Sequence, residues 1–154
     1  MLLPLYDHLA WADAQALAAI RAMPESAERE RAATLYAHLA AAENVWLARL
    51  EHRAPSYAIW PALSLETAAD VAQASAVALR TIAAGDPASL RQTISYGNSS
   101  GVEYRNTVAD ILLHVALHGS YHRGQIALLA RQGGGAPAVT EYIAYMREQN
   151  TIDH

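Results

Sequence analysis

The sequence predicts an all-α fold: a four-helix bundle with a small β-hairpin inserted before the last long helix. Apolar residues recur at helical spacing over four long segments, and turn-forming residues separate those segments. A short stretch before the last segment changes to residues that favour strands. With 154 residues, 53% of them hydrophobic, the chain is long enough to bury one core, so we expect a single domain over residues 1–154.

The first two predicted helices cover residues 2–23 and about 28–51, where apolar residues recur every three or four positions along one side. Pro24 ends the first helix, because a proline disfavours helical backbone in the residue before it. The segment 53–64 contains prolines and is predicted to be a loop.

A third helix is predicted to begin at Ser64 and to stop at Gly85–Pro87. A serine at a helix start can accept hydrogen bonds from the first unpaired backbone N–H groups, and Glu66 in the first turn strengthens this signal. Glycine followed by proline ends the helix, because neither residue continues it well.

Residues 90–104 depart from the helical pattern and predict the hairpin. Thr93–Tyr96 favour a strand, Gly97–Gly101 have turn chemistry, and Val102–Tyr104 alternate again.

The last long helix is predicted from about Thr107 to Gln132, where three consecutive glycines end it. One more short helix is expected between Thr140 and Glu148.

Composition limits the function classes. The balance of 11 basic and 15 acidic residues gives a net charge of -4, and no basic stripe is visible, so a nucleic-acid partner is not expected. The N-terminus lacks the pattern of a signal peptide, and no uncharged apolar run reaches the roughly 18 residues of a membrane span. We therefore expect a cytoplasmic protein that does not enter a membrane.

The chain has no cysteine, which excludes disulfides, protein thiolate nucleophiles and cysteine-ligated zinc. Any metal site must use nitrogen and oxygen ligands. His118 and His122 lie one turn apart on a predicted helix, so their side chains share a face and can bind one ion. His38, among apolar residues in the middle of another helix, is the best third ligand, and His8 is the next candidate.

His114 continues the same spacing one turn earlier. Each step of four residues turns by about 40° and rises about 6 Å, so three such residues cannot all reach one ion. We therefore expect two ligands from this helix and one from elsewhere. His114 should be structural or support a ligand ring, and Asp110 should either cap the helix start or orient a ligand ring.

The role of Arg123, the residue after His122, has two alternatives. Arg123 could form an ion pair with Asp7, Asp13 or Glu43, or it could capture an anion near the metal.

Glycines inside this helix predict tight packing at Gly119 and Gly124, and we expect Trp46 and Tyr121 to be packing residues.

Four segments resemble those of the DinB family, the bacterial four-helix-bundle proteins also described as YfiT-like metal-dependent hydrolases. The strongest is His114-Val-Ala-Leu-His-Gly-Ser-Tyr-His-Arg-Gly-Gln-Ile126, which is similar to the motif of the family's last helix. Residues 6–13, His38 followed by Glu43 and Trp46, and residues 141–145 resemble further family segments, so the resemblance covers nearly the whole chain.

The resemblance implies a metal triad on His38, His118 and His122, the same residues that spacing favours. It also implies a divalent ion (nickel, zinc or iron) with water at open positions, and homodimers. Some relatives are transferases or isomerases that use a low-molecular-weight thiol, bacillithiol or mycothiol.

The leading functional hypothesis is a metal-dependent enzyme that activates a water or a thiol for a small-molecule substrate, as a thiol-dependent transferase or a hydrolase. Hydrolysis would need a general base, and Glu43 lies about 140° around its helix from His38, so thiol activation has more support. The alternatives are a non-catalytic, stress-associated metal-binding homodimer and a helical dimer whose histidines only stabilise the core. Catalytic residues are not assigned.

Overall fold

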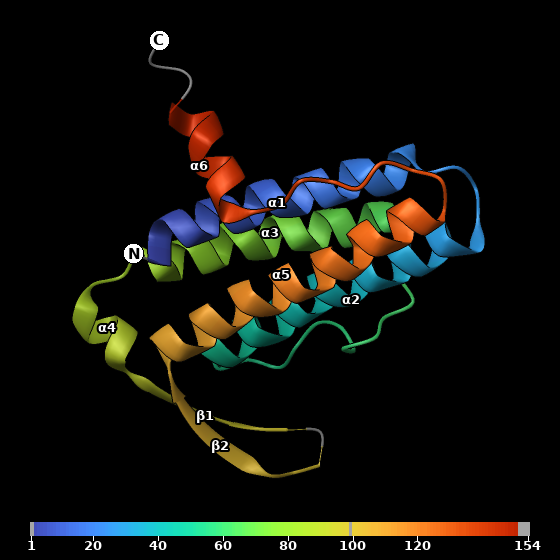
Figure 1. The fold of residues 1–154 in the computed structure, drawn as a ribbon. Helices are drawn as coiled ribbons and strands as arrows, with labels where there is room; N and C mark the ends of the chain where they lie inside the picture. The colour runs from blue at the N-terminus through green and yellow to red at the C-terminus, as the bar shows by residue number, and fades with distance from the viewer. Residues whose placement is uncertain (1, 99, 151–154) are drawn as a thin grey trace.

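The computed structural model describes residues 2–98 and 100–150. Within them the protein is mainly helical, and the predicted all-α class with a hairpin before the last long helix is confirmed (Figure 1). The long helices are α1 (Leu2–Ala22), α2 (Ala27–Leu50), α3 (Leu65–Ala83) and α5 (Val108–Gln132). The shorter elements are α4 (Pro87–Arg91), β1 (Thr93–Gly97), β2 (Glu103–Thr107) and α6 (Tyr142–Asn150).

The four long helices form a bundle in which α1 and α2 each pack against both α3 and α5. The segment 51–64 runs back along the bundle, so α3 points the same way as α2, and α5 lies antiparallel to α2 (Figure 1). The pair α2 and α5 therefore forms one side of the bundle, and the predicted histidine ligands come from these two helices.

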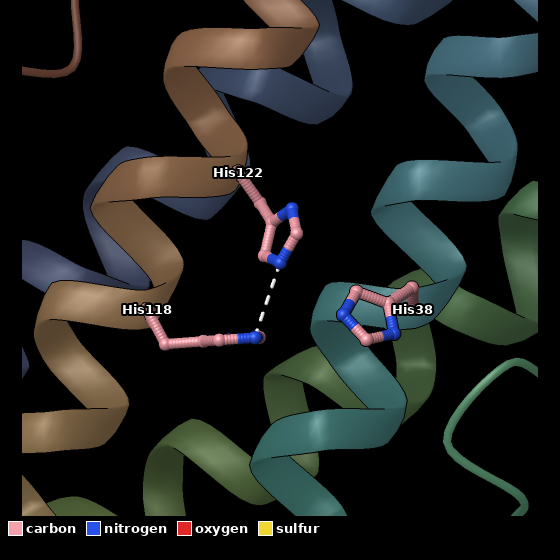
Figure 2. A group of neighbouring side chains, drawn as sticks. All are labelled: His38, His118 and His122. Atoms are coloured by element: carbon pink, nitrogen blue, oxygen red, sulfur yellow. Dashed lines mark hydrogen bonds between the residues drawn. The ribbon is translucent and has the colours of Figure 1, made fainter.

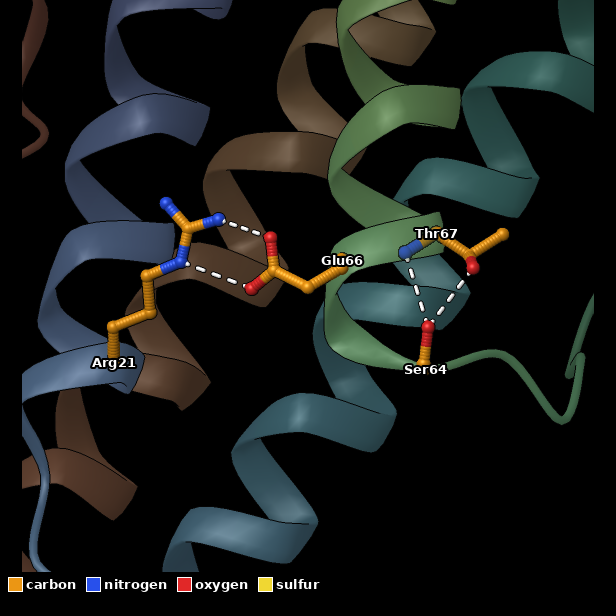
Figure 3. Close-up of polar contacts among 4 residues, drawn as sticks. All are labelled: Arg21, Ser64, Glu66 and Thr67. Atoms are coloured by element: carbon orange, nitrogen blue, oxygen red, sulfur yellow. Dashed lines mark hydrogen bonds and ion pairs between the residues drawn. The ribbon is translucent and has the colours of Figure 1, made fainter.

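Side-chain caps fix where the helices start. The Ser64 hydroxyl accepts a hydrogen bond from the Thr67 backbone N–H at the start of α3, as expected from the sequence (Figure 3). In the first turn of α3, Glu66 forms an ion pair with Arg21, which joins the start of α3 to the end of α1 (Figure 3). This contact helps to set how α1 and α3 pack.

The core consists of two groups of buried side chains along the bundle axis. One group surrounds Ile20 and Tyr36, and the other surrounds Tyr6 and Leu112. The Tyr6 hydroxyl donates to the Leu112 carbonyl at 3.0 Å, so the buried phenol is satisfied. Alanines fill much of the buried face of α2, which lets neighbouring helices approach closely.

Two details differ from the expectation. Pro87 stops α3 but also begins the short helix α4, because the Asp86 carboxylate accepts hydrogen bonds from two backbone N–H groups at its start. The second strand continues past Tyr104 to Thr107, with Thr107 paired to Thr93 in an antiparallel register. Of the predicted turn, Ser99 lies outside the described residues.

The chain after α5 returns along α1 (Figure 1). His8 on α1 lies 2.8 Å from the Thr140 carbonyl oxygen, and its ring contacts Tyr142 and Tyr145 of α6. None of the helices in the described ranges combines the length and the apolar character that a bilayer crossing requires.

Candidate metal centre

Three imidazole rings converge between α2 and α5. His38 comes from α2, His118 and His122 come from α5, and all three rings point into the same space (Figure 2). Each offers one ring nitrogen, and these three nitrogens lie within 4.8 Å of one another. The structure therefore brings together the three histidines that the sequence singled out.

Hydrogen bonds fix the rings of His38 and His122 in the form that a metal needs. Nδ1 of His38 lies 2.7 Å from the Ile59 carbonyl oxygen, and Nδ1 of His122 lies 2.7 Å from Oε1 of Gln125. Because a carbonyl oxygen can only accept, Nδ1 carries the proton in both rings. Nε2 of each of these rings then carries a lone pair, and in His122 this lone pair faces Nε2 of His118. Such support for the outer nitrogen is usual for metal-binding histidines.

The distances and the donor type fit a divalent transition metal. Nε2 of His118 and Nε2 of His122 are 3.1 Å apart. Two nitrogens bound to one ion at about 2.0–2.1 Å each are also about 3 Å apart in tetrahedral or octahedral geometry. Imidazole nitrogens suit zinc, nickel and iron, and three protein ligands leave coordination positions open.

The electrostatic environment favours neutral rings. Burial lowers the pKa of His118 to about 4, and the neighbouring rings of His122 and His38 add to this effect. Burial also lowers the pKa of His38, against the opposing effect of its hydrogen bond to Ile59. Neutral imidazole is the form that binds a metal, so the lowered pKa values of His118 and His38 favour metal binding.

Two aromatic residues flank the triad. Trp60, from the segment after α2, stacks on His38 with ring centroids 3.8 Å apart, and its own side chain is 57% exposed. Tyr121 contacts the His122 ring edge-on but is 66% exposed, so its predicted role as a packing residue is wrong. Trp46 does pack, between Tyr96 and His114.

An open groove of about 580 Å³ lies between α2 and α5. Gln125, which supports His122, also lines this groove, so the groove adjoins the triad. Its lining residues are Arg31, Thr34, Leu35, Gln125, Leu128, Leu129 and Gln132.

The other histidines considered do not join the triad. His114 is exposed and packs edge-on against Trp46, and its ring centroid lies 5.8 Å from that of His118. Asp110 forms a reciprocal cap with Thr107 at the start of α5. Of its two predicted roles, Asp110 therefore caps the helix and does not orient a ligand ring. His8 instead holds the C-terminal segment.

Arg123 points away from the triad into the bundle core. It is 2% exposed and donates to Asp13 Oδ1 at 2.7 Å, so among the predicted alternatives the ion pair with Asp13 is formed. Glu43 is buried beside this pair, and burial together with Asp13 raises the pKa of Glu43 well above its ordinary value. Glu43 therefore belongs to the buried group around Arg123 and Asp13 rather than to the triad.

The Arg123 side chain also explains one helical glycine. A Cβ atom at Gly119 would lie 2.8 Å from the Arg123 guanidinium, so the tight packing predicted at Gly119 is confirmed. At Gly124 that prediction is wrong, because a Cβ atom there would meet nothing within 4 Å among the described atoms.

Sequence reasoning missed the groups that support the ligands. Gln125 carries a recognisable signal, because a residue three positions after His122 on a helix can reach its ring. Ile59 contributes a backbone carbonyl and Trp60 a ring from an irregular segment, and neither has a sequence signal that links it to His38.

Comparison with known proteins agrees with this description. The family model described as the DinB family matches residues 1–153. A curated protein named Protein DinB, from Bacillus subtilis (strain 168), is 40% identical over 57 residues, which is 37% of this chain and 33% of that relative. The aligned stretch thus spans one third of the relative's length. No solved structure matches the chain significantly.

Proposed function

The chain belongs to the DinB family, and from this premise we propose that it is a metal-dependent enzyme whose ion is held by His38, His118 and His122. One observation carries the proposal: one ring nitrogen from each of three histidines lies within 4.8 Å of the others, and hydrogen bonds at Nδ1 hold the rings of His38 and His122 in place. Nickel, zinc and iron all suit this donor set.

We favour activation of a low-molecular-weight thiol over activation of water. A bound divalent ion supplies Lewis acidity, which lowers the pKa of a thiol or water that it coordinates. Hydrolysis would also need a general base, and the group of potential ligands found among the described residues contains histidines and no carboxylate. The absence of cysteine means that no protein thiol competes for the open positions.

The groove beside the triad favours catalysis over metal binding alone. At about 580 Å³ it is within the size range of small-molecule sites, and Gln125, which holds the His122 ring, lines it. The alternative, a non-catalytic metal-binding protein, requires no such space.

Cobalt(II) spectroscopy tests the thiol proposal. Protein loaded with Co²⁺ should develop a thiolate-to-cobalt absorption band when N-acetylcysteine is added, and the band cannot come from the protein because the chain has no cysteine. The triple variant His38→Ala/His118→Ala/His122→Ala should give no band. A wild-type protein that binds Co²⁺ but gives no band with thiols would contradict thiol activation. A wild-type protein that binds no Co²⁺ would contradict the metal site itself.

We also propose that the protein forms a homodimer through the outer face of α5. Three large apolar side chains on this helix are between 47% and 66% exposed: Leu113, Leu117 and Tyr121. At about 100° per residue they fall within about 80° of the helix circumference, so they form one stripe. A contiguous exposed apolar stripe of this kind is typical of an interface.

Light scattering after size-exclusion chromatography tests the dimer. Leu117→Lys should shift the protein from dimer to monomer, because a charge would be buried in the middle of the interface. Val77→Lys is the matched control, since Val77 is 63% exposed on α3 and lies outside the stripe. A monomeric wild type, or a dimer that survives Leu117→Lys, would rule this interface out.

The remaining expectations stay predictions. We expect that the protein binds a small molecule rather than a nucleic acid, and that it is located in the cytoplasm.

A further inference from the structure

The groove between α2 and α5 has an apolar middle and a positively charged end. Leu35, Leu128 and Leu129 form the apolar part, and Arg31 lines the groove near the start of α2. This arrangement matches a ligand with an aliphatic body and one anionic group.

At its other end the groove is lined by Gln125, whose side chain contacts one ring of the triad and holds His122 through Nδ1. Arg31 precedes His38 by seven residues, two turns of the same helix, which places it about 10 Å along the axis from His38. The helices α2 and α5 are antiparallel (Figure 1). Residues later in α5 therefore lie beside residues earlier in α2, and the groove runs from Gln125 towards Arg31.

Arg31 is a cation available for a ligand. Its side chain is exposed, and it has no hydrogen bond or ion pair to any residue in 2–98 or 100–150. Arg29, two residues earlier, is instead paired with Glu25. The first turn of α2 carries the acidic residues Glu28 and Glu30, which reduce the local positive potential and disfavour a dianion. The chemistry therefore selects a singly charged carboxylate over a phosphate.

We infer that this groove binds the substrate, a small aliphatic carboxylate whose anionic end pairs with Arg31 and whose other end lies at the histidine triad. The inference rests on the proposed function, because only a reactive centre at the triad makes the bound molecule a substrate. Arg31 acts in binding and specificity and does not touch the reacting atoms.

Calorimetric titration with octanoate tests the inference on the full chain without added metal. Arg31→Gln should weaken octanoate binding by about two- to fivefold, the effect of losing one exposed charge pair. Arg105→Gln is the matched control, because Arg105 is an exposed arginine on the hairpin, and it should bind like wild type. Octanol has the same body without the charge, so its binding should not respond to Arg31→Gln.

Three results would overturn the inference: wild type that does not bind octanoate, Arg31→Gln that binds it equally well, or tighter binding of octyl phosphate than of octanoate. Zinc titration of the same samples separates this inference from the proposed function. Wild type and Arg31→Gln should bind zinc equally, so loss of octanoate binding with intact zinc binding concerns the groove alone. A wild type that binds no zinc but still binds octanoate through Arg31 contradicts the metal proposal alone.

In Co²⁺-loaded protein the orientation of the ligand can be measured. Paramagnetic broadening of the octanoate proton signals should be strongest at the terminal methyl group and weakest beside the carboxylate. The reverse gradient would contradict the placement of the carboxylate at Arg31.

Discussion

Single residues outside the triad decide whether its histidines are ready to bind a metal. Oε1 of Gln125 accepts a hydrogen bond from Nδ1–H of His122 at 2.7 Å and so turns Nε2 of that ring towards the centre. Gln125→Leu should weaken zinc affinity by about 10- to 100-fold, the usual effect of removing the group that orients a metal-binding histidine. Competition with a chromophoric chelator measures this affinity.

Two control variants make the test specific. Gln125→Glu keeps an acceptor for the Nδ1 proton and should retain zinc affinity, whereas Gln132→Leu changes the same groove without a contact to His122. If Gln125→Leu binds zinc as wild type does, Gln125 has no orienting role.

At this scale the sequence predicts ligands better than it predicts their supports. The four-residue spacing of His118 and His122 requires both rings to share a face, so spacing alone identifies the pair. His38 stands out because a buried imidazole without a partner would be costly. The Ile59 carbonyl could not be predicted, because it depends on the path of an irregular segment.

Glu43 should make the stability of the protein depend on pH. Burial and the neighbouring Asp13 raise the pKa of Glu43, so the folded state keeps its proton at pH values where the unfolded chain releases it. Stability from this group is therefore complete below about pH 4.3, the ordinary glutamate pKa, and falls as pH rises through the folded-state pKa.

Urea unfolding from acidic to neutral pH, compared with Glu43→Gln, isolates this effect. Burial lowers the pKa of His118 and His38, which reduces stability as pH falls below about 6.5, but this is common to both proteins and cancels in the difference. The free energy of unfolding of Glu43→Gln should therefore increase relative to that of wild type as pH rises. A difference independent of pH would show that Glu43 is not held in its protonated form.

Among the elements, α5 has the largest share of the site, since it carries His118 and His122 as well as Gln125. Its start is fixed by a reciprocal cap: the Thr107 hydroxyl accepts from the Asp110 backbone, and the Asp110 carboxylate accepts from the Thr107 backbone and hydroxyl.

Thr107→Ala should reduce the free energy of unfolding by about 1 kcal/mol, because the helix start loses its side-chain acceptor. Urea denaturation measures the change. Thr81→Ala is the matched control: Thr81 is an exposed threonine inside α3 whose hydroxyl donates only to the Val77 carbonyl one turn earlier, so its loss should cost little. Equal losses in the two variants would show that the cap is unimportant.

The sequence predicted the elements well where they are long. Periodicity over many residues identified α1, α2, α3 and α5 with ends close to those observed. The five-residue helix α4 was missed because it is shorter than two turns and shows no period, although Asp86 and Pro87 together form a helix-start signal. The hairpin ends later than predicted because strand pairing continues to the residue that caps α5.

At the scale of the whole molecule, the route of segment 51–64 connects the fold to the site. Because this segment runs back along the bundle, α2 and α3 are parallel (Figure 1). The same course brings Trp60 onto the His38 ring. Periodicity and turn signals predict helices but not the order in which they pack, so they do not predict the contact between Trp60 and His38.

The buried pair of Arg123 and Asp13 is a second feature of the whole molecule. It joins α5 to α1 across the core, and its Nη1–Oδ1 distance is 2.7 Å. The sequence left three acidic partners open because helix spacing alone does not say which helices are neighbours. In the structure Asp13 of α1 forms the ion pair, while Asp7 on the same helix pairs with Arg80 of α3.

The central claim is that His38, His118 and His122 together bind one divalent metal ion, and calorimetric zinc titration of untagged protein tests it most directly. Wild type should bind one ion per chain, and each of His38→Ala, His118→Ala and His122→Ala should lose the high-affinity site. His114→Ala, the matched control from the same helix, should bind like wild type, because His114 lies outside the ligand group. A wild type that binds no zinc, or a His114→Ala variant that fails as the triad variants do, would contradict the account.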